Sequence, residues 1–553
     1  MEARLMPLMA ACMCILIVAG SSGQAQVRRF VPVTDAVLQN PDPADWLNWR
    51  RTLDGWGHSP LDQIHKGNVA KLQLAWSWTI EPGAFQTTPV VHDGVMYLAN
   101  PGSVIQALDA RTGDLIWEYR RKLRSTGQLR NLAIYEDLIL VNTVDGHIVA
   151  LDAQSGAERW DTPLGGAAGS GPIIANGTAI TGVGAARGAI AAFDARTGKE
   201  VWRISTIAGP DEPGGDTWNG LAPKLRVGGN AWMPGTFDPI NNTTFWGTAQ
   251  AKPWARAARG TGDAEELYAA STMALDPATG KLKWYFQHFR GDSHDMDEVF
   301  ERILIDHDGK SSVFTMGKLG ILWELDRKTG RFVHATDLGY QNLVDLNPKT
   351  GRLTYRPGML PVIGKETFFC PVVGGFKSLR AMAYHPQTKA FYVPLCLACE
   401  TGTFMPVERK EDDASGGDIA NRKKSFHPKS LGQLGEFLAM RAATGEVMWR
   451  QRRATPFSTA ALTTGGGLVF VGDWDRFVFA YDAETGEQLW QTRLALMTNG
   501  FPITYAVNGK QYVAVSAGAS IGQSNWMDIL PRALVPEKRN PRVGNGIYVF
   551  ALP

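Results

Sequence analysis

Acidic side chains gather in one short segment of the sequence. Residues 291–298 read GDSHDMDE, with Asp295 and Asp297 two positions apart. If this segment ends a strand, residues i and i+2 face the same side, so the two carboxylates converge. Paired carboxylate oxygens suit a hard cation such as calcium. The pattern therefore predicts a metal-binding pair, and the alternative is an acidic turn that binds no ion.

Several other catalytic spacings are missing from the chain. Its 10 histidines form no HxH, HxxxH or HExxH pattern, which argues against a zinc or mononuclear iron enzyme. There is no GxGxxG after a strand pattern, so nicotinamide chemistry loses support. Cys396 and Cys399 form a CxxC, but Glu400 stands where covalent haem attachment needs histidine.

The elements that must position the acidic residues come from a repeat, apolar-Ala-Leu-Asp-x-x-Thr-Gly-x-x-x-Trp. The alternation before Asp predicts a half-buried strand, and Thr-Gly predicts a tight turn with glycine at positive φ. The tryptophan of each copy is expected to dock between adjacent sheets. Full copies begin at Asp109, Asp152, Asp194, Asp276 and Asp482, and degraded copies at Asp326, which lacks the Trp, and at Arg441, which replaces the Asp.

The spacing of the copies predicts a β-propeller. Neighbouring copies lie 41 to 50 residues apart, close to the roughly 40–45 residues of a four-stranded blade. Two intervals, of 82 and 115 residues, each hide a blade or a long insertion. The seven visible copies and further hidden or terminal units predict eight blades. The strand at 546–550 is expected to pair with a strand near 72–78 and so close the ring.

The composition agrees with a large all-β protein. Of the 553 residues, 44% are hydrophobic, enough for a large core, and 60 glycines and 31 prolines indicate many turns. Docking accounts for much of the count of 18 tryptophans. The net charge is +2, so we expect no nucleic acid and no anionic membrane as a partner.

The N-terminus predicts export. Arg4, the apolar run 5–20 and a small-x-small site at 23–25 indicate a signal peptide over 1–25. Residues 26–553 would then form one domain in the periplasm. The apolar run is short for a membrane span and nothing later is apolar enough, so we expect no stable span. An uncleaved anchor is the alternative.

Two features in the second half of the chain have simpler expectations. In an oxidising compartment Cys370 is expected to pair with either Cys396 or Cys399, and the closed loop would stabilise the fold by about 3 kcal/mol. The charged segment Glu408–Ser430 is interpreted as a loop between blades, more simply a surface excursion than a lid over a binding site.

The repeat resembles the tryptophan-docking motif of the alcohol dehydrogenases that depend on pyrroloquinoline quinone (PQQ). The resemblance extends from about Asp45 to Ala551 and includes WGHSPLDQI at 56–64, NVAKL at 68–72 and PITY at 502–505. It implies an eight-bladed propeller that binds PQQ together with calcium or a lanthanide ion. No haem domain follows the propeller, so the resemblance implies the soluble type, with a separate cytochrome c as electron acceptor.

The resemblance also assigns roles to individual residues. Trp232, outside the repeat register, matches the indole that forms the floor under the quinone; the alternative is another docking tryptophan. Asp295 matches the catalytic base, and Asp297 an extra acidic ligand of lanthanide-using members. Lys318 matches the basic residue at the quinone oxygens, with a surface lysine as the alternative. The remaining implied residues are Arg130, Gln86 and Ser378 for the cofactor and Gln250 for the metal.

The sequence departs from the family pattern around the metal. Val183 stands where the family has a ligating glutamate, and valine cannot bind a cation. Gln250 replaces a ligating asparagine and moves the amide oxygen one methylene further out, and Ser378 stands near another usual asparagine. Asp297 or Glu298 is a candidate to compensate. His294 replaces a usual tryptophan, which would widen or polarise the substrate side.

These observations predict a quinoprotein that oxidises an alcohol to an aldehyde or ketone by hydride transfer to PQQ. The altered metal ligands and His294 favour a bulkier or secondary alcohol over methanol. The alternative is a propeller scaffold of the cell envelope without chemistry, and the loss of the glutamate at Val183 is its best support. The resemblance leaves a homodimer open.

Overall fold

The protein is built almost entirely from β-strands, which confirms the predicted all-β class. The computed structural model describes residues 30–122, 129–518, 526–541 and 544–553, so the predicted signal peptide lies outside the described residues. None of the helices in these ranges is long and apolar enough to cross a membrane. The helices are α1 (Asp35–Gln39), α2 (Arg256–Arg259) and α3 (Trp526–Leu534), with short 3₁₀ turns at Val69–Lys71, Gly215–Trp218, Pro223–Leu225 and Pro428–Ser430.

The strands form a series of larger sheets. Within the described ranges, eight sheets have four or five strands. The first three contain β4 (Val90–His92), β5 (Val95–Asn100), β6 (Val104–Asp109) and β7 (Leu115–Arg120); β3 (Phe85–Thr88), β8 (Leu129–Tyr135), β9 (Leu138–Thr143), β10 (His147–Asp152) and β11 (Glu158–Pro163); and β12 (Ala167–Ala168), β13 (Ile173–Ala175), β14 (Thr178–Gly184), β15 (Ala189–Asp194) and β16 (Glu200–Ser205).

The other five larger sheets follow along the chain. They contain β18 (Thr236–Asp238), β19 (Thr243–Gly247), β21 (Ser271–Leu275) and β22 (Leu282–Gln287); β23 (Ile303–His307), β24 (Lys310–Met316), β25 (Ile321–Asp326) and β26 (Phe332–Asp337); β30 (Ala383–His385), β31 (Ala390–Cys396), β34 (Gly435–Arg441) and β35 (Val447–Arg453); β1 (His58–Ser59), β36 (Leu462–Thr464), β37 (Leu468–Gly472), β38 (Phe477–Asp482) and β39 (Gln488–Arg493); and β2 (Gln73–Ile80), β40 (Ile503–Val507), β41 (Lys510–Gly518) and β42 (Asn545–Ala551).

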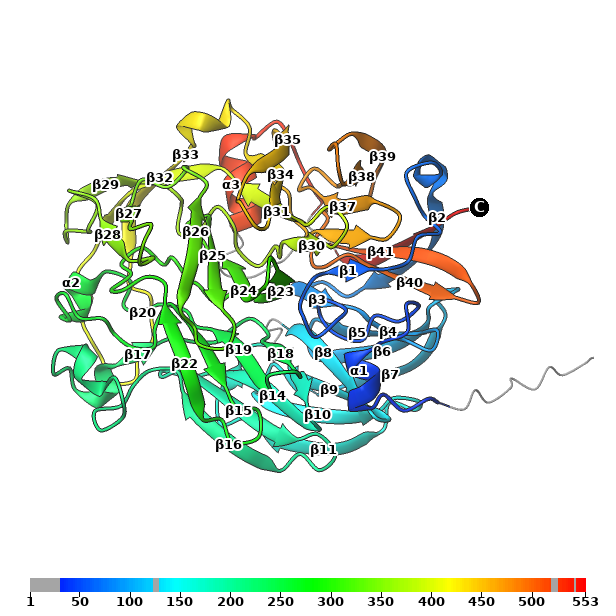
Figure 1. The fold of residues 1–553 in the computed structure, drawn as a ribbon, viewed down its shortest axis with the longest axis horizontal. Helices are drawn as coiled ribbons and strands as arrows, with labels where there is room; N and C mark the ends of the chain where they lie inside the picture. The colour runs from blue at the N-terminus through cyan, green and yellow to red at the C-terminus, as the bar shows by residue number, and fades with distance from the viewer. Residues whose placement is uncertain (1–29, 123–128, 519–525, 542–543) are drawn as a thin grey trace, which may run out of the picture.

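The two ends of the chain meet in one sheet. Strand β2 pairs antiparallel with β42, from Gln73 opposite Ala551 to Ile80 opposite Asn545. This confirms the predicted pairing of an early strand with the C-terminal one. Figure 1 shows the sheets following one another around the molecule until the last returns to the first. Among the described sheets, each large one therefore has a neighbouring sheet on either side.

Each visible copy of the repeat belongs to a different larger sheet, and the closing sheet of β2 and β40–β42 adds one more. Neither long interval contains another large sheet within the described residues. Residues 206–235 are an insertion before β18. The interval after Asp326 holds two small sheets, of β27 (Val344–Leu346) with β28 (Leu353–Tyr355), and of β29 (Glu366–Phe369), β32 (Ala398–Phe404) and β33 (Ile419–Phe426). The intervals therefore hold insertions, not blades.

The turn of the repeat has the predicted chemistry. In the copy at Asp194, the carboxylate accepts hydrogen bonds from the amide and the hydroxyl of Thr197, at 2.9 and 2.8 Å. Gly198 has φ +71°, a conformation that costs glycine little. The outer strand that follows, β16, is exposed or half-buried except at Trp202. Charged residues on such an outer strand discourage pairing with another chain.

Five tryptophans of the repeat, and Trp76 of the closing sheet, contact the turn of the next sheet. Trp117 lies against Gly156, where a Cβ atom would come within 2.5 Å of the indole carbon Cε3. The same contact recurs from sheet to sheet. The indole nitrogen in each case donates to a carbonyl of the next turn: Trp76 to Ala110, Trp117 to Ala153, Trp160 to Ala195, Trp202 to Pro277, Trp284 to Arg327 and Trp449 to Ala483.

Gly156→Ala is expected to destabilise the protein by about 1–3 kcal/mol, because the new methyl group overlaps the Trp117 ring. The measurement is the midpoint of urea unfolding. Gly358→Ala is the matched control, since Gly358 has a similar φ of +80° but nothing within 4 Å of its Cβ position. Equal losses in the two variants would show that backbone strain, and not the indole contact, sets the effect.

The segment Glu408–Ser430 is only partly the loop that its composition indicates. Residues Ile419–Phe426 form strand β33, which pairs antiparallel with β32 from Ala398 opposite Phe426. The expectation of a loop is wrong there, because a buried neighbouring strand offers backbone partners that composition does not reveal.

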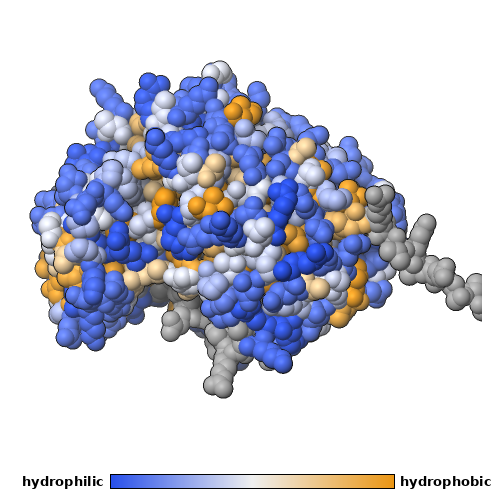
Figure 2. All heavy atoms as spheres, turned by 90° about the horizontal axis from the view of Figure 1, so that it is seen from below, coloured by the Kyte–Doolittle hydropathy of each residue, from blue (hydrophilic) through white to orange (hydrophobic). Residues whose placement is uncertain are grey.

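Figure 2 shows one face of the molecule as mostly hydrophilic, with hydrophobic residues in small scattered groups.

Candidate active site

The acidic segment lies in an irregular loop between β22 and β23, so the expectation of a strand end is wrong. A side chain shapes the loop instead. The buried carboxylate of Asp292 accepts hydrogen bonds from the amides of His294 at 2.9 Å and Met296 at 2.6 Å. Burial raises the pKa of Asp292 to about 7. Asp295, held between these bonded residues, adopts φ +62°, which aspartate tolerates better than most residues.

Lys318 brings the two aspartates together. It lies in the turn between β24 and β25, and its Nζ is 3.0 Å from Asp295 Oδ2 and 3.0 Å from Asp297 Oδ2. Burial lowers the pKa of Lys318, but the two carboxylates outweigh it and raise the pKa above its usual value. Burial raises the pKa of Asp295 to about 6, although Lys318 opposes this. The expectation that the carboxylates converge is therefore met by a loop and a buried cation.

Gln250 completes this group. It lies between β19 and β20 (Ala251–Lys252), and its Nε2 donates to Asp295 Oδ1 at 2.9 Å. Its side-chain Oε1 accepts from the backbone amide of Asp295 at 3.2 Å, and its backbone amide donates to Asp297 Oδ1 at 3.1 Å. Gln250 is fully buried. The glutamine side chain, one methylene longer than the family's usual asparagine, therefore reaches both the backbone amide and the carboxylate of Asp295.

A second group surrounds a half-buried indole. The guanidinium carbon of Arg130, on β8, lies 4.5 Å from the centre of the Trp232 ring. Gln86, on β3, accepts a hydrogen bond from Arg130 at 3.1 Å. Burial lowers the pKa of Arg130 to about 10, so it remains a cation at neutral pH. Phe300 packs edge-on against Trp232, with ring centres 5.3 Å apart.

The two groups are joined through the backbone. The amide of Gly229 donates to the carbonyl of Gln250 at 2.9 Å, and the amide of Ala249 donates to Asn230 at 3.1 Å. Phe300 belongs to the same loop as the aspartates, so that loop contacts both groups.

Ser378 is half-buried, and its carbonyl oxygen lies 3.5 Å from Lys377 Nζ. Among the described contacts, its side chain reaches none of the other predicted site residues.

The departures from the family pattern have clear structural outcomes. Val183 is buried in the apolar cluster that contains Ala231 and Met233, so this position offers no oxygen. His294 is fully buried among the rings of Tyr355, Phe369 and Phe404. Burial lowers the pKa of His294 to about 3, so the ring is neutral. It adds an imidazole to an aromatic wall, but no charge.

Sequence reasoning missed several residues of the surroundings. Lys252 acts on Asp295 through its charge. Lys377 and Glu301 form a fully buried ion pair at 2.8 Å, with the ammonium 4.8 Å from the centre of the Phe300 ring. Glu298, in contrast, is the compensating ligand that the sequence offered beside Asp297, and both oxygens of its buried carboxylate lack a hydrogen-bond partner among the described atoms. These contacts join residues distant in sequence, and no local spacing signals them.

The cysteines settle a question that the sequence left open. Cys370 and Cys399 form the disulfide, 29 residues apart, while Cys396 is a buried thiol. Burial raises the pKa of Cys396 to about 11. The loop after Cys370 packs on the active-site lysine, because the amide of Phe376 donates to the carbonyl of Lys318 at 2.9 Å. The disulfide therefore braces a segment next to the site.

The residues present fit both a hard cation and a flat anionic cofactor. Two carboxylates and the amide oxygen of Gln250 are the oxygen ligands that calcium and lanthanide ions favour. Near Gln86 and Arg130, the buried side-chain oxygens of Thr87, Thr88 and Asn131 lack hydrogen-bond partners among the described residues. Unpaired buried polar atoms in the two strands that carry Gln86 and Arg130 are suited to a ligand with several oxygens.

The closed series of four- and five-stranded sheets defines the class of this protein, a β-propeller. The family model of the PQQ-type glucose, ethanol and alcohol dehydrogenase β-propeller domain matches residues 46–160, 165–337 and 431–513. The chain belongs to this family of PQQ-dependent alcohol dehydrogenases, which confirms the resemblance. Its relatives are therefore enzymes, and not only non-catalytic propeller scaffolds.

Individual relatives agree with the family. The chain is 30% identical to quinohemoprotein alcohol dehydrogenase ADH-IIG of Pseudomonas putida, over 87% of this chain and 73% of the relative. It is 29% identical to quinoprotein alcohol dehydrogenase PedH of Pseudomonas putida, over 94% and 93%. The solved structure of ADH-IIG matches with a TM-score of 0.84 at 27% identity, covering 95% of this chain and 83% of that one. A europium-containing methanol dehydrogenase matches with a TM-score of 0.83 at 26% identity, covering 94% and 99%.

Proposed function

We propose that this protein oxidises an alcohol to an aldehyde or ketone with PQQ as the hydride acceptor. One buried group of residues carries the proposal. In it, Lys318 Nζ lies 3.0 Å from Asp295 and 3.0 Å from Asp297. Gln250 donates to Asp295, and its backbone bonds to the segment that contains Trp232. The eight larger sheets act as eight blades, and the tryptophan contacts join most of them to the next.

Asp295 serves as the general base. Its carboxylate removes the proton from the alcohol hydroxyl as hydride leaves the carbinol carbon. With a pKa of about 6, it is mostly ionised at neutral pH and can accept this proton. Lys318 keeps its proton and supplies a fixed positive charge, which stabilises negative charge that develops on nearby oxygens.

The cofactor residues follow from the second group. Trp232 offers a half-buried indole for stacking, while Arg130, Gln86 and Ser378 supply polar contacts at the edge of the ring. PQQ, when bound, takes up the hydride from the substrate carbon. Asp295, Asp297 and Gln250 would hold a calcium or lanthanide ion, which would supply Lewis-acid chemistry at this site.

The cellular setting is part of the same proposal. A signal peptide over 1–25 exports the chain to the periplasm, where the disulfide between Cys370 and Cys399 can form. A separate soluble cytochrome c would accept the electrons one at a time. The exchange of the family's usual tryptophan for a neutral His294 supports a bulkier or secondary alcohol over methanol.

The test is a dye-linked oxidation assay on purified protein, with and without PQQ, and with calcium or lanthanum. Each preparation is tested on a panel of primary and secondary alcohols. Turnover is expected only when both PQQ and a cation are present, with the highest kcat/KM on alcohols larger than methanol. Activity that does not depend on PQQ would refute the proposal. Failure to bind PQQ would leave the non-catalytic scaffold as the better account.

A further inference from the structure

Two segments carry the proposed metal ligands, and both depend on contacts outside regular structure. Gln250 comes from one segment, 248–255, and Asp295 and Asp297 come from the other, 291–297. Apart from the two-residue strand β20, neither segment lies within a strand. In such loops, side chains supply part of the hydrogen bonds that a regular ladder would otherwise provide. The conformation of the site therefore depends on its supporting polar contacts.

Arg259 joins these two segments from behind. It is the last residue of α2, and its side chain is fully buried. Its guanidinium donates to the backbone carbonyl of Asp292 at 2.9 Å. Asp292 begins the turn that holds Asp295. It also donates to the carbonyls of Pro253 at 2.7 Å and Trp254 at 2.6 Å, and to Ala251 at 3.3 Å, the residue after Gln250.

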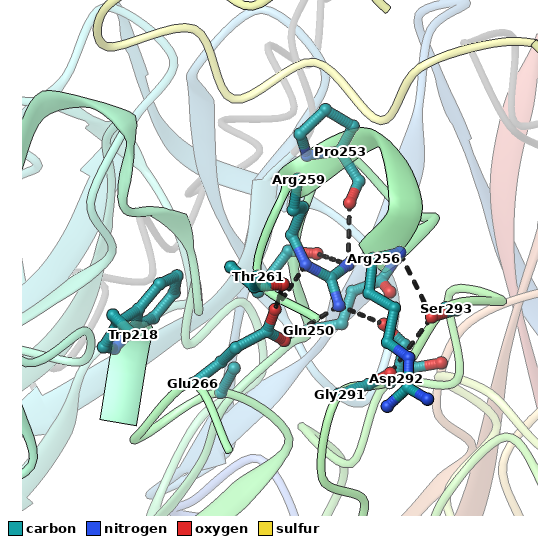
Figure 3. A network of polar contacts seen from close by, with 12 residues as sticks. Trp218, Gln250, Pro253, Arg256, Arg259, Thr261, Glu266, Gly291, Asp292 and Ser293 are labelled. Carbon is teal, nitrogen blue, oxygen red and sulfur yellow. Dashed lines mark hydrogen bonds and ion pairs between the residues drawn. The ribbon is translucent and has the colours of Figure 1, made fainter. Parts of the chain in front are cut away.

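A buried carboxylate fixes the direction of this guanidinium. Glu266 accepts from Arg259 Nε at 2.7 Å and from its NH2 group at 2.8 Å. Its side chain is 2% exposed, and Thr261 also donates to it. Figure 3 shows the guanidinium between Glu266 on one side and the Pro253 and Asp292 backbone on the other. Two parallel bonds to one carboxylate leave the guanidinium little freedom to rotate.

We infer that Arg259 and Glu266 are positioning residues that set the separation of the metal-binding carboxylates from Gln250. The inference rests on the proposed function of the site. Gln250 bonds directly to Asp295 and Asp297 on the ligand side, while Arg259 holds the same two segments together on the far side. Two clamps on opposite sides fix both the distance and the tilt between the segments, whereas the Gln250 contacts alone leave a hinge.

The test uses Arg259→Lys and Glu266→Gln in the full-length protein. Lysine keeps the charge beside Glu266, but its single nitrogen cannot reach the carboxylate and both segments at once. Calcium and lanthanum are titrated into PQQ-loaded, metal-depleted protein, and heat release and the quinone absorption spectrum report binding. We expect Arg259→Lys to weaken cation binding about 10–100-fold, the range typical of residues that orient metal ligands, with PQQ content unchanged. Glu266→Gln keeps one acceptor, so a fall of about three- to tenfold is expected.

The matched control is Glu436→Gln. Glu436 is also a fully buried carboxylate bonded to an arginine, Arg452 at 2.8 Å, but it lies on β34 and contacts neither segment. Cation affinity in this variant should equal that of the unmodified protein. Equal loss in Glu436→Gln and Glu266→Gln would overturn the inference, because it would show a general effect on stability.

The outcomes separate this inference from the function it rests on. If the unmodified protein binds PQQ and a cation and oxidises alcohols, but both variants bind the cation equally well, only the inference is wrong. If the unmodified protein binds neither, the proposed function is wrong and the inference falls with it. If Arg259→Lys fails to fold, Glu266→Gln still decides, since it keeps the arginine in place.

Discussion

Asp295→Asn is expected to lower kcat by about 10²–10⁴-fold while the protein keeps its PQQ, because it removes the proton acceptor and preserves the shape of the side chain. Asparagine suits this position, since Asp295 has φ +62° and asparagine adopts that conformation more readily than most residues. Lys318 keeps an anionic partner in Asp297. The measurements are turnover in the dye-linked assay and quinone absorption after purification.

Asp473→Asn provides the control for loss of a buried carboxylate. Asp473 is fully buried and lies 3.1 Å from Arg453, outside the candidate site. This variant should lose stability but retain kcat. Near-normal turnover in Asp295→Asn would place the base elsewhere, and equal loss of turnover in both variants would point to a general loss of structure.

Lys318→Met is expected to lower the free energy of unfolding of the metal-free protein by about 3–5 kcal/mol. The variant removes the cation from two aspartates and leaves buried charges without compensation. Calcium or lanthanum should restore much of this stability, because the freed carboxylates can bind the ion. Turnover should nevertheless stay about 10²–10³-fold low, since the fixed charge near the quinone oxygens is lost. Chemical unfolding with and without the ion, and kcat, measure both effects.

The comparison for this variant is Lys66→Met. Lys66 also forms an ion pair, with Asp482 at 2.9 Å, but its side chain is 41% exposed. A pair of this kind contributes about 0–1 kcal/mol. The proposed role of Lys318 would be contradicted if the two lysine variants lost the same stability, or if added cation had no greater effect on Lys318→Met.

The sequence predicted the parts of the fold that repeat. The turn at Asp194, the positive φ of Gly198 and the pairing of β2 with β42 all follow from short patterns that recur or sit at the chain ends. Insertions were harder to interpret. The interval after Asp194 could have held another blade, because chain length alone does not distinguish a four-stranded sheet from a long connection.

The candidate site was predictable in its residue types but not in its geometry. Asp295, Asp297, Lys318 and Gln250 were named from motifs, and the structure brings them into contact. We expected strand alternation to bring the carboxylates together. The structure instead brings them together through the turn at Asp292. Arg259 was missed because its partners are mostly backbone carbonyls, which leave no mark in the sequence. Non-local hydrogen bonds of this kind are visible only in three dimensions.

The pairing of β2 with β42 has a consequence for the order of assembly. Strand β42, Asn545–Ala551, follows all the other described strands along the chain, yet it lies between β2 and β41 in one sheet. The circle of sheets therefore stays open until β42 is in place between these two strands. A chain that lacks β42 exposes the unpaired edges of β2 and β41, so loss of these 7 residues should impair the whole molecule far more than their number suggests.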